Sequence, residues 1–277
     1  MSVLGDLRGS RELLSNLTMR EVRGKYKRSL LGQGWSLLNP IATLSIYSLV
    51  FGFVLRQNPA PGDPSGLKVF ALWLACALLP WNFFNNTVQG GMSALVSNGN
   101  LLQKVYFPRY TLVVASMLAS LVTFGFELVV LLVALVLFGA TPWLFLPGVI
   151  VAVVVMAFFG LGIALMLSIA NVYFRDTAQF VGIFMQIWFY ATPIIYPVHL
   201  IQDKQIELKA QGNNIPLEFI YRLNPLDRFS TIFRNLFYDN RWPAWDDALY
   251  CFCAAAISMT LGIWVFTRFQ GKIAEEL

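Results

Sequence analysis

The stretch NVYFRDTAQFVGIFMQIWFYATPIIYP, residues 171–197, holds the charged pair Arg175-Asp176 between two long apolar runs. One run covers residues 144–170, and the other follows the charged pair and carries two prolines near its end. Each run is long enough to cross a hydrocarbon layer of ~30 Å. Because lipid cannot satisfy an open backbone, both runs are expected to be helices joined by a turn in water. Either this turn is only the tip of a membrane hairpin, or the charged pair also contacts a cytoplasmic partner.

The composition of the chain favours an integral membrane protein over a soluble one. Its 277 residues are 57% hydrophobic and only 13% charged, whereas a soluble protein has about a quarter of its residues charged. The net charge of +5 would also suit nucleic-acid binding, but the basic residues gather within the first 28 positions, just before the first apolar run. Such a cluster follows the positive-inside rule and attracts anionic lipid. We therefore expect membrane lipids, and no nucleic acid, as partners.

The apolar runs predict an all-α integral membrane protein with six transmembrane helices. A basic amphipathic segment, residues 10–31, precedes them and is expected to lie as an interface helix along the lipid headgroups. Because the first 35 residues are polar, no cleavable signal peptide is expected, and the first span must itself direct insertion. The six expected spans are residues 37–55, 68–90 with a kink at Pro80, 110–138, 144–173, 177–196 and 248–267.

The distribution of basic residues orients these helices in the plasma (inner) membrane. Lys and Arg concentrate in the N-terminal arm, the loop 92–109, the central turn and the tail. The basic residues of the long loop 198–247 are mixed with acidic ones, and long loops carry little topological weight. Both termini are therefore expected to be cytoplasmic. The single domain, residues 1–277, divides into a cytoplasmic interface region 1–35, five helices within 36–197, an extracytoplasmic loop 198–247, a sixth helix 248–267 and a cytoplasmic tail 268–277.

Four stretches of the chain, taken in order, resemble the permease subunit of ABC-type polysaccharide exporters. Each stretch is a weak motif alone, but the four in register are specific and span nearly the whole chain. This family moves O-antigen, teichoic acid, capsular or galactan chains across a plasma membrane. The four are YKRSLLGQGWSLLNP (26–40), KVYFPRY (104–110), the quoted segment 171–197 and LNPLDRFSTIFRNLFY (223–238).

The resemblance implies a transport role and defined partners. The substrate would be a lipid-linked glycan, and the chain would work as a homodimer with two copies of a separate ATPase subunit. ATP and Mg would be bound by that ATPase, with no cofactor or metal in this chain. A small-molecule or drug exporter of the same architecture is the nearest alternative. A membrane-embedded glycosyl- or acyl-transferase is a further alternative, for which only Glu127 and His199 offer thin support.

Motif searches agree that the chain does not hydrolyse ATP by itself. Gly24-Lys25 and Gly271-Lys272 lack the upstream glycine and the following hydroxyl of a phosphate-binding loop. The sequence contains one histidine, no H-E-x-x-H and no G-x-S-x-G, so no catalytic motif supports an enzymatic function. The three cysteines fall within apolar runs and lack metal-ligand spacing.

Polar side chains recur at helical spacing inside the expected spans. Such groups are costly in hydrocarbon unless they pair with one another or face a wet cavity. One interpretation is hydrogen bonding between helices. The other is a conduit whose amides and aromatic faces slide past sugar rings, since Tyr and Trp combine a flat apolar face with a polar group. The candidate conduit residues are Asn39, Thr43, Tyr47, Gln179, Gln186, Trp188 and Tyr190.

Contacts with the ATPase are expected at the cytoplasmic side. The segment 92–109 has a short apolar face and, by resemblance, contains a coupling helix that inserts into a groove on the ATPase. The basic segment 10–31 would form a second docking surface. The alternatives are a simple interfacial turn and a mere lipid anchor. The candidate coupling residues are Arg20, Arg23, Tyr26, Leu101, Lys104, Tyr106, Arg109, Arg175 and Asp176.

The loop 198–247 contains a third candidate element. Asn224-Pro225 is typical of a helix N-cap followed by a first-turn proline. Phe229, Phe233 and Phe237 then recur at helical spacing and predict an amphipathic helix on, or dipping into, the outer membrane face. By resemblance, short helices here act as an outer gate; otherwise this is a surface helix that packs the bundle.

Two features have roles that the sequence leaves open. Glu127 is the one acid deep in an apolar run, and it is either a protonated, hydrogen-bonded structural residue or part of a proton-coupled carrier. Small residues recur every fourth position on two expected spans and permit close helix approach, either within the bundle or at a subunit contact. They are Gly160, Ala164 and Ser168 on one span, and Ala254, Ser258 and Gly262 on the other.

Overall fold

The computed structural model describes residues 11–24, 32–54, 61–105, 107–211 and 216–273. The side chains of residues 33, 36, 37, 39, 40 and 272 also lie outside the description. Every regular element in the described part is a helix. They are α2 (Arg11–Gly24), η1 (Gly32–Gly34), α3 (Trp35–Tyr47), η2 (Ser48–Val54), α4 (Phe70–Ser97), α5 (Gly99–Lys104), α6 (Tyr110–Leu137), η3 (Pro142–Phe145), α7 (Leu146–Tyr173), α8 (Thr177–Tyr190), α9 (His199–Ala210), α10 (Leu217–Arg222), α11 (Pro225–Arg234), η4 (Asn235–Asp239), α12 (Trp245–Phe269) and η5 (Gln270–Lys272).

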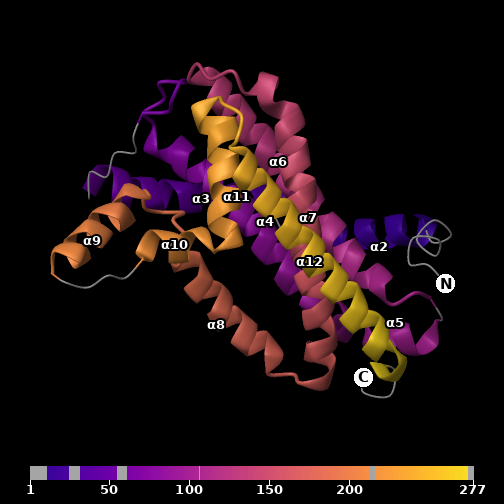
Figure 1. The fold of residues 1–277 in the computed structure, drawn as a ribbon. Coiled ribbons are helices and arrows are strands. Elements are labelled where there is room, and N and C mark those ends of the chain that lie inside the picture. Colours follow the sequence, from indigo (N-terminus) through magenta and orange to yellow (C-terminus); the bar gives the residue numbers. More distant parts are fainter. Residues whose placement is uncertain (1–10, 25–31, 55–60, 106, 212–215, 274–277) are drawn as a thin grey trace.

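The upright helices pack around α4, which lies at the centre of the bundle (Figure 1). Most residues of α4 are buried against α6, α7 and α11. Stacked phenyl rings join α4 to its neighbours, with centroids 4.8 Å apart for Phe83 and Phe124 and 5.4 Å apart for Phe84 and Phe159. Burial of such rings contributes more than any other apolar side chain to a helical core. The core therefore follows α4 along its length.

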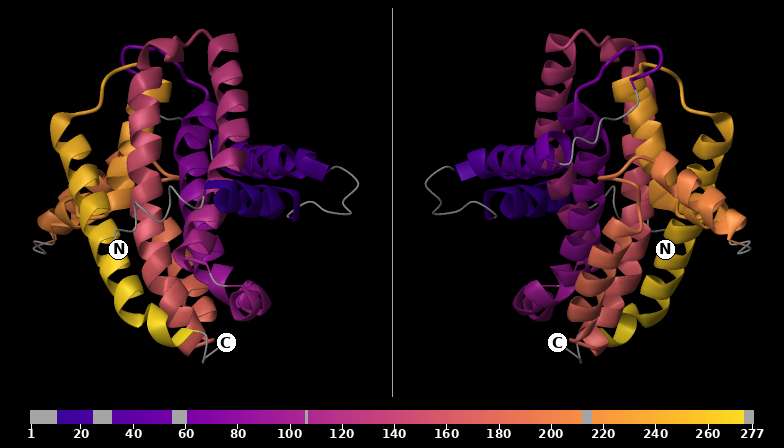
Figure 2. Two further views of the ribbon diagram at one scale, coloured as in Figure 1. Left: turned by 90° about the vertical axis from the view of Figure 1, so that its right-hand side faces the viewer. Right: turned by 90° about the vertical axis from the view of Figure 1, so that its left-hand side faces the viewer.

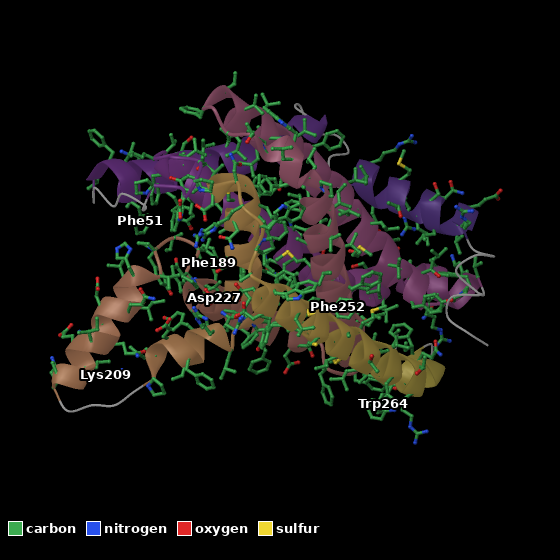
Figure 3. The ribbon with its side chains drawn as sticks, turned by 45° about the horizontal axis from the view of Figure 1, so that its top comes forward. Phe51, Phe189, Lys209, Asp227, Phe252 and Trp264 are labelled. Atoms are coloured by element: carbon green, nitrogen blue, oxygen red, sulfur yellow. The ribbon has the colours of Figure 1, made fainter. Side chains whose placement is uncertain are left out.

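Three helical segments in the described part are long and apolar enough to cross a membrane, namely Tyr110–Leu137, Pro142–Tyr173 and Trp245–Phe269. Their outward faces expose large apolar side chains such as Ile150 and, on α12, Phe252, each 62% exposed (Figure 3). In water this exposure would be costly, but hydrocarbon is the favourable surrounding for it. The segments agree with the expected spans 110–138, 144–173 and 248–267 to within a few residues.

The other three expected spans differ from the prediction in length or direction. The first becomes α3 and η2, and Figure 2 shows α2 and α3 lying crosswise to the upright helices. The second, α4, is longer than expected and includes Pro80. The Asn and Gln residues in its middle lower its mean hydropathy, so it is not among the segments apolar enough to cross a membrane, and α6 and α7 cover it. The fifth, α8, ends at Tyr190 instead of residue 196. Six spans therefore stay a prediction.

The early end of α8 has a local cause. Pro193 has no N–H to donate and disfavours helical geometry at the residue before it. The Thr192 N–H donates to the carbonyl of Phe189, and the Ile194 N–H donates to that of Thr192, so the chain turns instead of continuing as a helix. The Thr192 side chain donates to the carbonyl of Trp188 at 2.8 Å. A compact turn, residues 191–197, therefore follows α8.

The predicted ladder of α12 packs on α7 through Gly162, which is not a member of the predicted α7 ladder, whereas Gly160 and Ala164 of that ladder face α4. Gly162 of α7 lies against Gly262 and Ser258 of α12, so that a Cβ on either glycine would come within 2.4 Å of backbone atoms of the other helix. The Ser258 hydroxyl donates to the Phe159 carbonyl at 2.8 Å. On the other face of α7, Gly160 approaches Thr87 of α4. The structure thus decides between the two interpretations of the ladders in favour of packing within the bundle.

A candidate conduit, gate and coupling surface

Helix α8 carries four of the seven predicted conduit residues, three of them on a face that its own chain leaves open. Gln179 and Gln186 are exposed, and so is Tyr190. Phe180 and Ile183 lie on the same open side of the helix, exposed by 70% and 60%. The opposite side of the helix packs on the bundle through Val181, Met185 and Phe189, which are buried. An open face of amides and aromatic rings is thus a property of α8.

Of the predicted conduit residues on α3, Tyr47 has an interaction with α8. Tyr47 is half-buried and meets Phe51 edge-to-face at 6.1 Å. The phenol groups of Tyr47 and Tyr190 lie within electrostatic range of each other, although they come from segments far apart in the sequence. Thr43 is half-buried on the same helix. The Asn39 side chain lies outside the described part of the chain.

Trp188 has a different setting from its neighbours on α8. Its indole N–H donates to the Asn224 Oδ1 at 2.8 Å. Its ring packs against Phe84 of α4 at 5.5 Å and against Phe184 at 5.2 Å. Trp188 is half-buried and contacts the protein itself on several sides. It therefore joins α8 to the bundle as well as bordering the open face.

Asn224 is the junction between α8 and α11. Its Oδ1 accepts the Leu226 N–H at 3.1 Å and so caps α11, as the sequence predicts. The same oxygen accepts the Trp188 indole N–H, and the Asn224 Nδ2 donates to the Thr192 hydroxyl at 2.9 Å. One amide side chain therefore begins the predicted gate helix and holds it to the end of α8. Sequence reasoning identified the cap, but the two further bonds link residues more than thirty positions apart.

Arg234 makes the second link between these elements, and sequence reasoning missed it. Its two terminal nitrogens donate to the carbonyls of Pro193 and Ile194 at 2.8 and 2.7 Å. Its guanidinium lies over the Trp73 ring of α4, 3.7 Å from the centroid. Burial lowers the pKa of Arg234 to about 10, so the side chain remains charged at neutral pH. The signal in the sequence was a cation on the apolar face of an amphipathic helix, next to Phe233 and Phe237.

The three predicted gate phenylalanines are fully buried in the chain's own core. Phe229 packs on Phe159 of α7 at 5.8 Å, and Phe233 stacks on Phe237 at 6.1 Å. Helix α11 stands between α4 and α12 instead of lying on an outer surface. Its predicted amphipathic character is confirmed, with Arg228 of its polar side bonded to Asp247 of α12 at 2.6 Å. The three phenyl rings therefore anchor α11 in the core, and any movement of α11 would move these rings with it.

The described coupling residues gather around α5. Arg20 of α2 donates to the Asn98 Oδ1, the side chain at the corner between α4 and α5. Arg109 donates to the Gln270 carbonyl and so ties the start of α6 to the end of α12. Leu101 is half-buried, and the remaining described members are exposed. The exposed members are Arg23, Lys104, Arg175 and Asp176.

Most of these coupling residues lie at one end of the molecule, whereas Arg20 and Arg23 belong to α2, which lies crosswise about halfway along the bundle (Figure 2). Figure 1 shows α5, the turn between α7 and α8, and the end of α12 at the same end of the bundle, whereas the turn between α6 and α7 lies at the other. Tyr26 and Tyr106 are outside the described residues. The apolar, charged and exposed groups at this end form a surface that another protein could contact.

Glu127 lies in α6 and is buried, with 8% of its surface exposed. It borders a small apolar cavity of about 110 Å³ together with Leu72 and Leu131. No group of three or more metal-ligating side chains occurs among the described residues.

The sequence of this chain is similar to that of known transport proteins. The family model for ABC-2 type transporters matches residues 12–238. The chain is 32% identical over 271 residues to "O-antigen export system permease protein RfbA" of Myxococcus xanthus, covering 96% of each protein. It is 25% identical over 267 residues to the protein of that name in Klebsiella pneumoniae, covering 96% of this chain and 95% of the relative.

A third relative is more distant. "Polysialic acid transport protein KpsM" of Escherichia coli is 22% identical over 189 residues, which is 67% of this chain and 70% of the relative. The family match confirms the sequence prediction of a membrane permease over an enzyme, and it implies a separate ATPase subunit. The family model covers most of the chain, and one relative matches it almost end to end. This chain therefore belongs to the ABC-2 type transporter family.

Proposed function

We propose that this chain is the permease of an ATP-driven exporter that moves a lipid-linked polysaccharide outward across the plasma membrane. The support from relatives is that three proteins named for O-antigen or polysialic acid transport match it, two of them over their whole length. The observation that carries the proposal in the structure is the open face of α8, where amides alternate with aromatic rings. A polysaccharide offers hydroxyl groups to such amides and flat apolar ring faces to Tyr and Phe.

The open face also supports a homodimer. One chain leaves Phe180, Ile183 and Tyr190 uncovered on α8. A second copy placed against this side would enclose a path between two α8 helices, with Tyr47 and Tyr190 of each copy at its edge. The complete exporter then contains two permease chains and two ATPase subunits. ATP and Mg belong to the ATPase.

The orientation and the gate complete the proposal. Both termini are cytoplasmic, α5 and the turn at Arg175-Asp176 face the ATPase, and α11 is the outer gate. Asn224 and Arg234 support the gate role of α11, because they tie its two ends to the end of α8 and to the turn that follows α8. A tilt of α8 that begins at the cytoplasmic turn is thereby passed to α11. Movement at the ATPase and movement at the outer gate are mechanically connected.

The experiment uses cells that lack the chromosomal copy of this gene and carry a plasmid copy. Tyr47→Ala, Trp188→Ala and Tyr190→Ala are each expected to lower surface polysaccharide severalfold, because each removes a ring from the proposed path. Phe252→Ala is the matched control, since Phe252 is an exposed ring on α12 away from α8. Surface polysaccharide is measured by gel and staining, and permease abundance by immunoblot.

Two results would argue against the proposal. Normal surface polysaccharide in the deletion strain would contradict export of that polymer by this chain. Loss of resistance to small toxic compounds, with polysaccharide unchanged, would favour the small-molecule exporter instead. Equal effects of Phe252→Ala and Tyr190→Ala would remove the case for a path along α8.

A further inference from the structure

A polar cavity of about 340 Å³ lies outside the proposed path along α8. It is bordered by the loop before α4, the start of α9, the end of α11 and η4. Figure 1 shows η4 and the loop before α4 at the end of the molecule opposite α5. Cavities of this volume are typical of sites for small ligands. Its position places it on the exit side of the proposed transport direction.

The lining of this cavity combines donors, acceptors and an aromatic ring. Arg241 supplies a guanidinium group and Asp63 and Asp239 supply carboxylates, while the Trp73 ring, covered by the guanidinium of Arg234, forms the buried side of the cavity. Two carboxylates would repel an inorganic anion, and charged groups would exclude an acyl chain. A sugar unit fits this chemistry, because each of its hydroxyl groups both donates and accepts hydrogen bonds.

Internal bonds hold the polar groups of the cavity in place. Arg241 bonds to the Asn235 Oδ1 at 3.0 Å and to the Asp239 carboxylate at 3.4 Å. Asp239 also accepts the Asp63 N–H at 3.4 Å, which joins the loop to η4. Arg234 is fixed by two backbone carbonyls and the Trp73 ring. A preformed set of polar groups lowers the entropic cost of binding a flexible ligand.

The rim of the cavity is accessible. His199 is exposed at the start of α9, and Asp63 is exposed in the loop before α4. The side chain of Arg241 is half-exposed. A polymer leaving the gate could therefore touch these residues without unfolding the site.

From this geometry we infer that the cavity bordered by Trp73, Arg234, Asn235, Asp239 and Arg241 binds a sugar unit of the polysaccharide as it leaves the permease. The inference rests on the proposed export function and adds an outer sugar site to it. Because Arg234 of this site also holds Pro193 and Ile194, the site is built on the same turn that follows α8. Binding there would keep an emerging chain at the exit while the next part is moved.

The test is photocrosslinking in intact cells that make their own surface polysaccharide. The permease, with its ATPase partner present, carries p-benzoylphenylalanine in place of His199 or, in a second strain, of Asp63. Both rim positions are expected to give, after irradiation, a purified denatured permease that stains for carbohydrate at least fivefold more strongly than without light. The control position is Gln211, which is exposed at the far end of α9. Arg241→Gln in the same strains is expected to lower the adduct severalfold at unchanged permease abundance.

Several outcomes would overturn the inference. These are equal adducts at positions 199 and 211, no adduct at either rim position, or an adduct indifferent to Arg241→Gln. An adduct at position 186 of α8 without one at the rim would also overturn it, while leaving the conduit intact. Failure of the export function is distinguishable, because it appears as normal surface polysaccharide in the strain that lacks the permease.

Discussion

At the scale of single residues, Asn224 has more partners than its position in the sequence suggests. It caps α11 and also receives the Trp188 indole N–H and bonds to Thr192. Loss of an N-cap costs about 1 kcal/mol, and a buried donor left without a partner costs about 1–3 kcal/mol. Substitutions at Asn224 can therefore separate the effect of losing the helix cap from the effect of losing the bond to Trp188.

We expect Asn224→Ala to lower the stability of the purified complex by about 2–3 kcal/mol and to reduce export. Asn224→Ser is the matched variant, since a serine can still cap α11 but cannot reach Trp188. It should recover part of the melting temperature in lipid nanodiscs while export stays low. Full export by Asn224→Ser would show that the link to Trp188 has no role in transport.

Asp227 is the second residue with a measurable consequence, because its carboxyl is buried at the first turn of α11 (Figure 3). The pKa of Asp227 is raised from 3.8 to about 6, mainly by burial and also by Asp247, while Arg234, Arg228 and Arg222 act against the rise. A folded-state pKa above the unfolded value means that the folded protein binds the proton more tightly. This group therefore favours folding below about pH 4, and the benefit is lost as the pH rises through about 6.

We expect Asp227→Asn to raise the melting temperature of the complex at pH 7.5 and to have no such effect near pH 4. A shift of about two pKa units corresponds to about 3 kcal/mol at most, reduced by the favourable position of the carboxylate near the positive end of the helix. Thermal scans of both proteins across this pH range test the prediction. A constant difference between wild type and variant at all pH values would contradict it.

At the scale of elements, the contact between α7 and α12 depends on the absence of side chains. A Cβ on Gly262 would lie 2.4 Å from the Gly162 carbonyl oxygen, which is backbone and cannot move aside alone. In an open helix, alanine is more favourable than glycine by about 1 kcal/mol. In this contact the clash reverses the sign, since overpacking costs about 1–3 kcal/mol or more.

Gly262→Ala is therefore expected to lower permease abundance and melting temperature. Gly125→Ala is the matched control: Gly125 lies in α6, and a Cβ there would have no neighbour within 4 Å. The control should leave abundance unchanged or raise it. Immunoblots of membranes and thermal scans of purified protein measure both. The same loss in both variants would place the cost in the helix and not in the contact.

At the scale of the whole molecule, the coupling residues of α5 and of the turn between α7 and α8 lie at the same end of the bundle (Figure 1). Arg175 is exposed in that turn. Lys204 is exposed on α9, which is part of the loop proposed to be extracytoplasmic. Substitutions of Arg175 and Lys204 therefore test which of the two proposed sides of the membrane contacts the ATPase.

We expect Arg175→Glu to reduce copurification of the ATPase subunit severalfold, because the change reverses charge at the proposed contact. Lys204→Glu should leave copurification unchanged. Affinity purification of the permease from membranes, followed by quantification of the ATPase, provides the measurement. The reverse pattern, with Lys204→Glu disruptive and Arg175→Glu neutral, would place the opposite end in the cytoplasm.

The predictable parts of the fold are those set by local properties of the chain. Three of the expected spans appear almost residue for residue, because the length of an apolar run determines whether a helix can cross a bilayer. The Asn224 cap is also local, since it depends on the side chain and an N–H two residues later. The direction of α3 and the early end of α8 depend on packing and turn geometry, which periodicity does not contain.

The candidate site divides in the same way. Tyr47 and Tyr190 were selected by residue type and helical spacing, and in the structure they lie within electrostatic range of each other. Trp188 was selected for an open path, but it is half-buried between α4 and Asn224. Arg234 was overlooked because its partners, two carbonyls and a ring, come from other segments and have no signature of their own.

The sequence by itself determined that this protein is an all-helical membrane permease without a phosphate-binding loop of its own, because apolar length, charge distribution and motif order are properties of the chain. Only the tertiary structure decided that α11 stands inside the bundle, held to α8 by Asn224 and to the following turn by Arg234. It also showed that the small-residue ladder of α12 packs on Gly162 of α7, while the predicted ladder of α7 packs on α4. The physical reason is that a hydrogen bond or a backbone contact requires two partners, and folding alone brings residues that are distant in sequence within reach of each other.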